Sequence, residues 1–334
     1  MTIEDIAREA GVHPASVSRA LRGIGKKVSE ETRQKIERIA KELGYRPNAL
    51  AASLRTKQTN LVGIVVPDLG NPLFGPIVQG LEVALRQHGL MCLVVQTPAA
   101  RAERREIVAA LANRQVSGLL ILAAESDDPM LEAAMEFSLP TVLVNRGFGE
   151  RRFPSVVNDD RESVRLVLEH LSQLGHQRVA HIAGPASSST GRARRQAFEE
   201  LLPGFGMTGV VVDAPAFTRE AGRDACLDLL GRTREPTAIF CANDLIAMGA
   251  LDALHKHQLS VPGDMSLVGH NDMPLVDLIA PPLTTVRIAT EQMSRQAAQL
   301  LLEHLKAPDE APCTRVLSPR LVVRGSTAAP RAGA

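Results

Sequence analysis

The chain has 334 residues, of which 45% are hydrophobic, 22% charged and only 3% aromatic, so it is long enough for about two domains with aliphatic cores. No apolar run approaches the roughly 18 residues of a membrane helix, and the acidic start MTIEDIAREAG lacks the apolar region of a secretory signal. Residues 1–60 hold 12 Lys and Arg against 7 Asp and Glu (net +5), whereas residues 61–334 hold 26 against 30 (net −4). A basic head on an acidic body suggests a polyanion as the partner of the head.

Three short helices are predicted in residues 2–44. Thr2 and Asp5 can cap the first helix, and Gly11 supplies the left-handed residue that ends it. Pro14 suits the first position of the second helix, where its missing N–H costs nothing. Ser29 caps the third helix, and apolar residues recur on one face of each segment. Two helices joined by a short glycine turn and braced by a third form a helix-turn-helix.

The start of the second helix has the properties of a DNA-reading surface. Pro14, Ala15 and Ser16 are small and permit a close approach to base edges. Arg19, one turn later, can offer two parallel donors to O6 and N7 of guanine. A generic three-helix scaffold with a surface arginine is the alternative, and this segment alone leaves both open.

Residues 45–60, YRPNALAASLRTKQTN, join this head to the rest of the chain. Pro47 ends the preceding helix, and Asn48 can cap a new helix of about eight residues, which is too short to be stable alone in water. The segment is either a linker or a helix that forms only against a partner.

From Leu61 onward, apolar runs alternate with amphipathic helical patterns. Nine runs predict strands: LVGIVVP, MCLVVQ, GLLIL, TVLVN, SVVN, RVAHIAG, GVVVDA, TAIFCA and SLVGH. Helices are predicted over 75–88, 103–115, 161–174, 190–202, 219–231, 244–257 and 289–305. This alternation indicates an α/β protein with parallel sheets, and the number of strands favours two doubly wound subdomains with a ligand between their strand carboxyl ends.

Over nearly its whole length the chain resembles the lac repressor family of bacterial transcription regulators. The resemblance rests on TIEDIAREAGVHPASVSRAL, VSEETRQKIERIAKELGYRPNALAASLRT, VGIVVPDLGNPLF, EHLSQLGHQRVAHIAGP, IFCANDLIAMGALDAL, VPGDMSLVGHNDMPL and PPLTTVR, in the order and spacing of the family. It implies a DNA-binding head (1–46), a hinge helix with linker (47–60) and a periplasmic-binding-protein-like body (61–330). It also implies a cytoplasmic homodimer that binds a palindromic operator and is switched by a small molecule.

The resemblance assigns DNA contacts to residues of the head and hinge. The residues that read bases are Pro14, Ala15 and Arg19, while Arg22, Arg33 and Arg46 contact phosphates. The hinge helices pair, and Leu54, with Arg55 beside it, enters the minor groove. Such an apolar wedge unstacks a base step and bends the duplex. The predicted DNA-binding set is Pro14, Ala15, Ser16, Arg19, Arg22, Asn48, Leu54 and Arg55.

The resemblance also assigns an effector pocket in the body. The matching residues are Asn71, Leu73, Phe74, Asn145, Asp159, Thr190, Arg194, Phe217, Asn243, Asp244 and Asn271. The family usually has Asp at the position of Asn271 and often at that of Asn145. An amide can donate as well as accept, so this pocket tolerates an anion better than one lined by carboxylates. We expect a sugar or sugar acid as effector. The alternative is that these two positions have drifted and do not contact the ligand.

Other functional classes find little support in the sequence. GFGMTG (204–209) matches G-x-G-x-x-G, but a helix precedes it and a strand follows it, which reverses the order of a dinucleotide site. No nucleophile motif, phosphate loop or metal-binding spacing occurs, so we expect no catalysis, no cofactor and no metal. The four scattered cysteines indicate reduced, mostly buried thiols. The main alternative is a sugar-binding protein with the same body and no role in transcription.

If Leu54 is the minor-groove wedge, Leu54→Ala should reduce both the bending of the operator and the affinity for it, while binding of the effector stays unchanged. Circular-permutation gel shifts and ligand titrations measure these quantities. An equal loss of DNA and effector binding would indicate misfolding instead.

Overall fold

The computed structural model describes residues 2–21, 28–45, 59–122, 124–125, 127–147, 152–233 and 235–331. The chain divides into two compact units, residues 1–59 and residues 60–334. We describe each unit by itself. Arg22, Arg46, Asn48, Leu54 and Arg55 lie outside the described residues, so the predicted hinge helix stays a prediction.

The described part of the first unit holds the three predicted helices, α1 (Ile3–Ala10), α2 (Pro14–Leu21) and α3 (Glu30–Glu42). The hydroxyl of Thr2 accepts a hydrogen bond from the backbone N–H of Asp5, and Gly11 ends α1 with φ at 68°. Ile6, Val17 and Ile36, one from each helix, are fully buried against one another in a small aliphatic core. Lys35 Nζ donates to the carbonyl oxygen of Ala10 (3.0 Å) and so ties α3 to the end of α1.

The second unit contains two six-stranded sheets. The first has the strand order β11-β5-β4-β3-β1-β2 and is parallel throughout. Its strands are β1 (Leu61–Val66), β2 (Met91–Gln96), β3 (Gly118–Leu122), β4 (Thr141–Asn145), β5 (Ser155–Asn158) and β11 (Thr314–Leu317). Nearly continuous Val, Ile and Leu runs suit these strands because β1, β3 and β4 are buried on both faces.

The second sheet has the order β12-β10-β9-β8-β6-β7 and is parallel except for β12, which pairs antiparallel with β10. Its strands are β6 (Arg178–Ala183), β7 (Thr208–Asp213), β8 (Ala238–Cys241), β9 (Ser266–Asn271), β10 (Thr284–Arg287) and β12 (Arg320–Val322). The two sheets therefore form two doubly wound subdomains, and the predicted fold class is confirmed.

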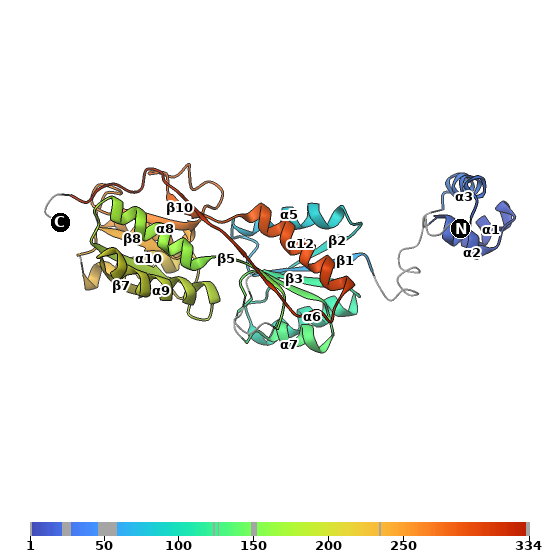
Figure 1. The fold of residues 1–334 in the computed structure, drawn as a ribbon, viewed down its shortest axis with the longest axis horizontal. Coiled ribbons are helices and arrows are strands. Elements are labelled where there is room, and N and C mark those ends of the chain that lie inside the picture. The colour runs from blue at the N-terminus through green and yellow to red at the C-terminus, as the bar shows by residue number, and fades with distance from the viewer. Residues whose placement is uncertain are drawn as a thin grey trace. The chain divides into compact units, whose positions relative to one another are not determined.

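Helices cover both faces of each sheet (Figure 1). In the first subdomain, α5 (Phe74–Arg86) and α12 (Thr290–Lys306) pack on one face. The other face is covered by α6 (Arg104–Asn113) and α7 (Pro129–Glu136), with the short 3-10 helix η1 (Arg101–Glu103) before α6. In the second subdomain, α10 (Arg219–Arg232) and α11 (Asp244–Lys256) lie opposite α8 (Asp160–Gln173) and α9 (Ser189–Leu201), which η2 (Leu202–Phe205) follows.

The chain crosses between the two subdomains three times. These connections run from β5 to α8, from β10 to α12 and from β11 to β12. Since α12 belongs to the core of the first subdomain although it follows β10 of the second, neither subdomain is made of one continuous segment. The residues at these connections therefore link the two subdomains.

All nine predicted strands and seven predicted body helices are present, with ends that shift by at most a few residues. The prediction from sequence did not include α7, β10, β11 and β12. These elements have three to eight residues each, which gives their hydrophobic periodicity few repeats. The predicted order around GFGMTG is confirmed, because η2 precedes β7 at this point, but the loop between them is limited to Gly206 and Met207.

The four cysteines are free thiols, as predicted, but they differ in burial. Cys226 and Cys241 are buried, Cys92 is half-buried and Cys313 is exposed. Burial raises the pKa of Cys226 to about 12 and that of Cys92 to about 11. Across the described ranges, every helix is too short or too polar to cross a membrane.

Helices α10 and α11 touch through glycines, which makes their spacing testable. A Cβ on Gly249 of α11 would lie 1.9 Å from the carbonyl oxygen of Arg219 in α10, so Gly249→Ala forces the helices apart. We expect a loss of roughly 1–3 kcal/mol in the free energy of unfolding, measured by urea denaturation. Gly231→Ala in α10 is the control, because its Cβ meets nothing within 4 Å and alanine favours a helix. Equal stability of the two variants would contradict this packing.

Candidate functional site

A cavity of about 240 Å³ lies at the carboxyl ends of strands from both sheets. The first subdomain contributes residues that follow β1 and β3 or end β4, and the second contributes residues that follow β6, β7 and β8 or end β9. The lining comprises Pro67, Asp68, Asn71, Leu73, Phe74, Glu125, Asn145, Arg146, Pro185, Ser187, Ser188, Thr190, Arg194, Pro215, Ala216, Phe217, Thr218, Asn243 and Asn271. This is the place where parallel α/β folds bind ligands.

The structure brings nine of the eleven predicted effector residues together around this cavity. They are Asn71, Leu73, Phe74, Asn145, Thr190, Arg194, Phe217, Asn243 and Asn271. The sequence predicts that these nine residues lie close together, and the structure agrees. Their role as ligand contacts is a proposal.

Asp159 and Asp244 do not line the cavity. The carboxylate of Asp159 caps α8 by accepting a hydrogen bond from the backbone N–H of Glu162 (2.8 Å). Asp244 is fully buried and accepts hydrogen bonds from the Thr285 hydroxyl (2.6 Å) and the backbone N–H of Met273 (2.8 Å). Both carboxylates therefore hold the protein together beside the cavity.

The N-termini of several helices face the cavity through their capping residues. Ser188 caps α9, Thr218 caps α10 and Asn243 caps α11, each by accepting a hydrogen bond from a backbone N–H in the first turn. All three residues line the cavity. Because a helix N-terminus carries partial positive charge, the three helices together favour negative charge in this space.

Arg194 is held in place by two hydrogen bonds at the cavity wall. Its Nε donates to Asp160 Oδ1 (2.8 Å), and a terminal nitrogen donates to the carbonyl oxygen of Ala242. The Arg194 side chain is 3% exposed. Burial raises the pKa of Asp160, while the charge of Arg194 opposes that rise. A guanidinium carries more N–H donors than these two contacts use, so Arg194 can also bind a ligand.

Arg146 contributes a second guanidinium to the lining. Its Cζ lies 5.1 Å from the centroid of the Phe217 ring, a cation–π arrangement that joins the two subdomains. Burial, together with the positive charge of Arg194, lowers the pKa of Arg146 to about 10. The two arginines therefore repel each other across the cavity wall.

Four asparagines line the cavity, and a protein donor already occupies the side-chain oxygen of each. Asn71 Oδ1 accepts from the backbone N–H of Leu73 (3.1 Å), and Asn243 Oδ1 accepts from that of Ile246 (2.8 Å). Asn145 Oδ1 accepts from Nδ2 of Asn158 (3.1 Å).

For Asn271, the fourth asparagine, the protein donor is the neighbouring residue His270. Its Oδ1 accepts from Nδ1 of His270 (3.0 Å), because an amide oxygen cannot donate, and this places a proton on Nδ1 of His270. Burial lowers the pKa of His270 well below its usual value, which favours the neutral imidazole. The NH₂ group of each of the four amides can donate to a ligand, and each amide oxygen keeps a second lone pair.

Asn145 and Asn271 occupy corresponding places in the two sheets. Each is the last residue of its strand and has a positive φ, 69° for Asn145 and 115° for Asn271. Asparagine tolerates this backbone region better than most residues. Backbone strain of this kind tends to concentrate at functional sites.

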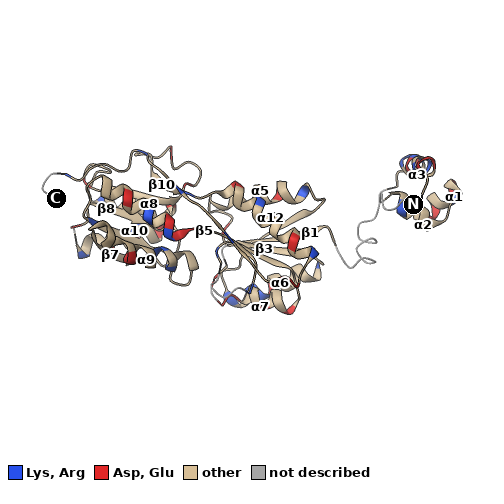
Figure 2. Ribbon diagram, viewed as in Figure 1, with Lys and Arg blue, Asp and Glu red and all other residues tan. Residues whose placement is uncertain are grey.

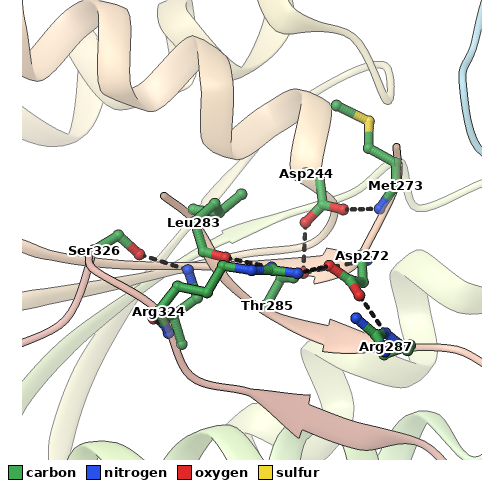
Figure 3. A network of polar contacts seen from close by, with 9 residues as sticks. Asp244, Asp272, Met273, Leu283, Thr285, Arg287, Arg324 and Ser326 are labelled. Atoms are coloured by element: carbon green, nitrogen blue, oxygen red, sulfur yellow. Dashed lines mark hydrogen bonds and ion pairs between the residues drawn. The ribbon is translucent and has the colours of Figure 1, made fainter. Parts of the chain in front are cut away.

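A network behind the cavity fixes the end of β9 (Figure 3). The carboxylate of Asp272 accepts hydrogen bonds from Arg324 (2.7 Å) and Arg287, and Arg324 also donates to the carbonyl oxygen of Leu283 (2.7 Å). Asp244 joins β9 and β10 through Met273 and Thr285. Asn271 therefore sits between a strand and a turn that are both held by buried carboxylates.

The prediction from sequence did not include several residues that line the cavity, among them Asp68, Glu125, Arg146, Ser188 and Thr218. Arg146 directly follows the buried strand β4, and Ser188 and Thr218 are N-caps of helices that follow strands. Their positions after strands of a parallel sheet were the signal that could have found them. In the described ranges, no group of three His, Cys, Asp or Glu is placed to hold a metal ion.

The described part of the DNA-binding set lies at the start of α2. Arg19 is exposed, while Pro14, Ala15 and Ser16 are half-buried. Nδ1 of His13 accepts a hydrogen bond from the backbone N–H of Ala15 (3.2 Å) and so caps this helix start. Figure 2 shows basic residues on both α2 and α3. Arg33 of α3 is predicted to contact phosphate. Its side chain is 31% exposed, and its Nη1 lies 3.6 Å from Oε2 of Glu30.

Comparison with protein families matches two parts of the chain. Residues 2–48 match the model of bacterial regulatory proteins of the lacI family, and residues 168–327 match a periplasmic binding protein-like domain. The HTH-type transcriptional repressor CytR of Escherichia coli (strain K12) is 31% identical over 98% of this chain and 96% of its own length. The HTH-type transcriptional regulator CelR of Thermobifida fusca is 34% identical over 97% and 98%, respectively.

Comparison with solved structures also finds bacterial transcriptional regulators. The lac repressor dimer bound to operator and the anti-inducer ONPF has a TM-score of 0.85 at 28% identity, covering 98% of this chain and 99% of that one. A complex of the transcriptional regulator CelR with cellobiose has a TM-score of 0.74 at 32% identity, with the same coverage. A LacI family regulator from Enterococcus faecium with bound ribose covers 80% of this chain, with a TM-score of 0.70 at 26% identity.

The buried Asp244 predicts a pH dependence of stability. Burial raises its pKa from 3.8 to about 7, so between these values the folded chain keeps a proton that the unfolded chain has lost. This group therefore makes the folded state less stable as the pH rises from 4 to 7. The stability advantage of the native protein over Asp244→Asn should shrink over that range in urea denaturation. An advantage that stays constant or grows with pH would contradict the assignment.

Proposed function

Because the chain belongs to the lacI family of bacterial regulatory proteins, we propose that it binds a palindromic operator as a homodimer and that a small carbohydrate-derived effector switches this binding. Family membership rests on relatives that are more than 30% identical over nearly the whole chain. The protein is thus a DNA-binding transcriptional regulator rather than an enzyme.

One observation carries the DNA-binding part of the proposal. The N-terminal unit is a three-helix unit in which α2 starts at a proline, is capped by His13 and exposes Arg19 one turn later. A recognition helix of a helix-turn-helix presents its N-terminal residues to base edges in the major groove. Small side chains at Pro14, Ala15 and Ser16 let the helix approach, and Arg19 then supplies bidentate donors for guanine.

Dimerisation follows from the symmetry of such operators. The related lac repressor structure is a dimer bound to its operator. A dimer of this chain carries two copies of α2, so each copy reads one half of a palindrome. We further propose that the protein acts in the cytoplasm as a repressor, with residues 1–46 as the reading head, 47–60 as the hinge and 61–330 as the sensor.

The cavity supports the effector part of the proposal. It lies between two subdomains that three chain crossings connect, so a ligand that contacts both sides favours the closed arrangement. A ligand shifts such an equilibrium only by its differential affinity for the two states. Related structures contain cellobiose and ribose, and a cavity of about 240 Å³ lined by amides, hydroxyls and two phenyl rings suits a small sugar-derived molecule.

Selection of genomic fragments by the purified full-length chain tests the proposal. We expect recovery of fragments that share a palindrome and whose protection from nuclease changes when the effector is added. A sugar-binding protein without a role in transcription, the alternative reading, would recover no common sequence at either low or moderate salt.

Arg19→Ala should weaken operator binding by roughly 1–3 kcal/mol and relax the preference at one base pair in each half-site. Fluorescence anisotropy with the operator and its single-base variants measures both effects. Arg38→Ala, which removes an exposed arginine from α3, is the control and should leave the sequence preference intact. An unchanged base preference in Arg19→Ala would contradict the role of Arg19.

A further inference from the structure

The arrangement of donors and acceptors in the cavity says which class of effector fits. The carbonyl oxygens of Asn71, Asn145, Asn243 and Asn271 are all engaged by protein donors. Each amide therefore has its NH₂ group left to donate and one lone pair of its oxygen left to accept. The four side chains thus offer a ligand more donor than acceptor positions.

The charged side chains that line the cavity also favour an anionic ligand. Arg146 and Arg194 both line the cavity, and Asp160 pairs with Arg194. Of the two acidic lining residues, Glu125 already pairs with Arg104 (2.9 Å), while Asp68 is exposed and accepts from the backbone N–H of Gly70. Arg146, Arg194 and the N-termini of α9, α10 and α11 therefore all offer positive charge to a ligand, beside the acids Glu125 and Asp160.

The proximity of the two arginines has a cost that a ligand can reduce. Arg146 is half-buried and is repelled by Arg194, while Glu125 and Asp160 attract it. Placing one charge near another of the same sign is unfavourable. An anionic group between the two arginines would replace their repulsion with two charge-assisted hydrogen-bond contacts. A neutral sugar offers no such compensation.

Resting on the proposed function, we propose that the effector is an anion: a small polyhydroxylated molecule whose carboxylate or phosphate oxygens are bound by Arg146, Arg194 and the amide NH₂ groups of Asn145 and Asn271. Phe74 and Phe217, which also line the cavity, are placed to pack against the apolar part of the ligand. The cavity of about 240 Å³ limits that ligand to a single sugar ring or an open chain of similar size.

His270 has a part in this selectivity as a positioning residue. By donating to Asn271 Oδ1, it turns the amide of Asn271 so that the NH₂ group is the one left for the ligand. Asn158 does the same for Asn145 in the other subdomain. The two asparagines that depart from the aspartates usual in the family are thus fixed as donors from both sides of the cavity.

Thermal unfolding of the full-length chain with matched sets of ligands tests the proposal. Each set contains a neutral aldose, the corresponding aldonic or uronic acid and the corresponding sugar phosphate, for example glucose, gluconate, glucuronate and glucose 6-phosphate. Sodium chloride keeps the ionic strength equal. At least one anion should raise the melting temperature more than its neutral parent does, and whether acids or phosphates respond distinguishes the two sources of charge.

Charge substitutions then test the contacts. Asn271→Asp and Asn145→Asp each place a negative charge where the anion lies, so each should raise the Kd of the responding anion at least about tenfold. Asn113→Asp, the same change at an exposed position that ends α6, is the control and should leave the Kd unchanged.

The outcomes separate this inference from the proposed function. It is overturned if no anion raises the melting temperature, if the neutral parents stabilise the chain as well as the anions, or if both Asp variants bind the anion as tightly as the native protein. A neutral sugar that alters operator binding would overturn it while leaving the proposed function intact. Anion binding without any operator binding would overturn the proposed function instead.

Discussion

The direction of the strands in the two sheets determines where the function of this protein can lie. In a parallel sheet, every strand carboxyl end and every following helix N-terminus meet at the same edge. Two such edges face one cavity, so residues from segments as distant as Asn71 and Asn271 line the same space. The helix N-termini make that space electropositive before any charged side chain is counted. The anionic ligand that we propose is the class that this backbone arrangement favours.

Buried polar groups then sharpen the chemistry that the backbone allows. Asp244 and Asp272 fix the turn after β9, and Asp160 fixes Arg194, so the groups that face the ligand hardly need to reorganise when it binds. Hydrogen bonds from His270 and Asn158 settle which end of an asparagine amide is offered. Asn158 and Asp160 also flank the first of the three crossings between the subdomains. We therefore expect ligand contacts at this end of the cavity to affect how the subdomains close.

Much of this could be predicted from the sequence, because long hydrophobic runs and strong caps leave few alternatives. The capping box of Thr2 and Asp5, the glycine turn at Gly11 and the buried Val, Ile and Leu strands all form as their patterns indicate. The short elements β11 and β12 carry too few residues for a pattern, and they find their places only by pairing with β5 and β10. Asp244 shows the limit for the site, since its place in a ligand motif did not reveal that Thr285 and Met273 occupy its oxygens.

Coupling between the cavity and the DNA-reading helix is the central claim, and thermodynamics makes it reciprocal. The most direct test measures the operator affinity of the full-length chain with and without saturating effector, and the effector affinity with and without operator. The account predicts that both affinities change in the same direction and by the same factor. Operator affinity that is identical in the free and the ligand-saturated protein would contradict it.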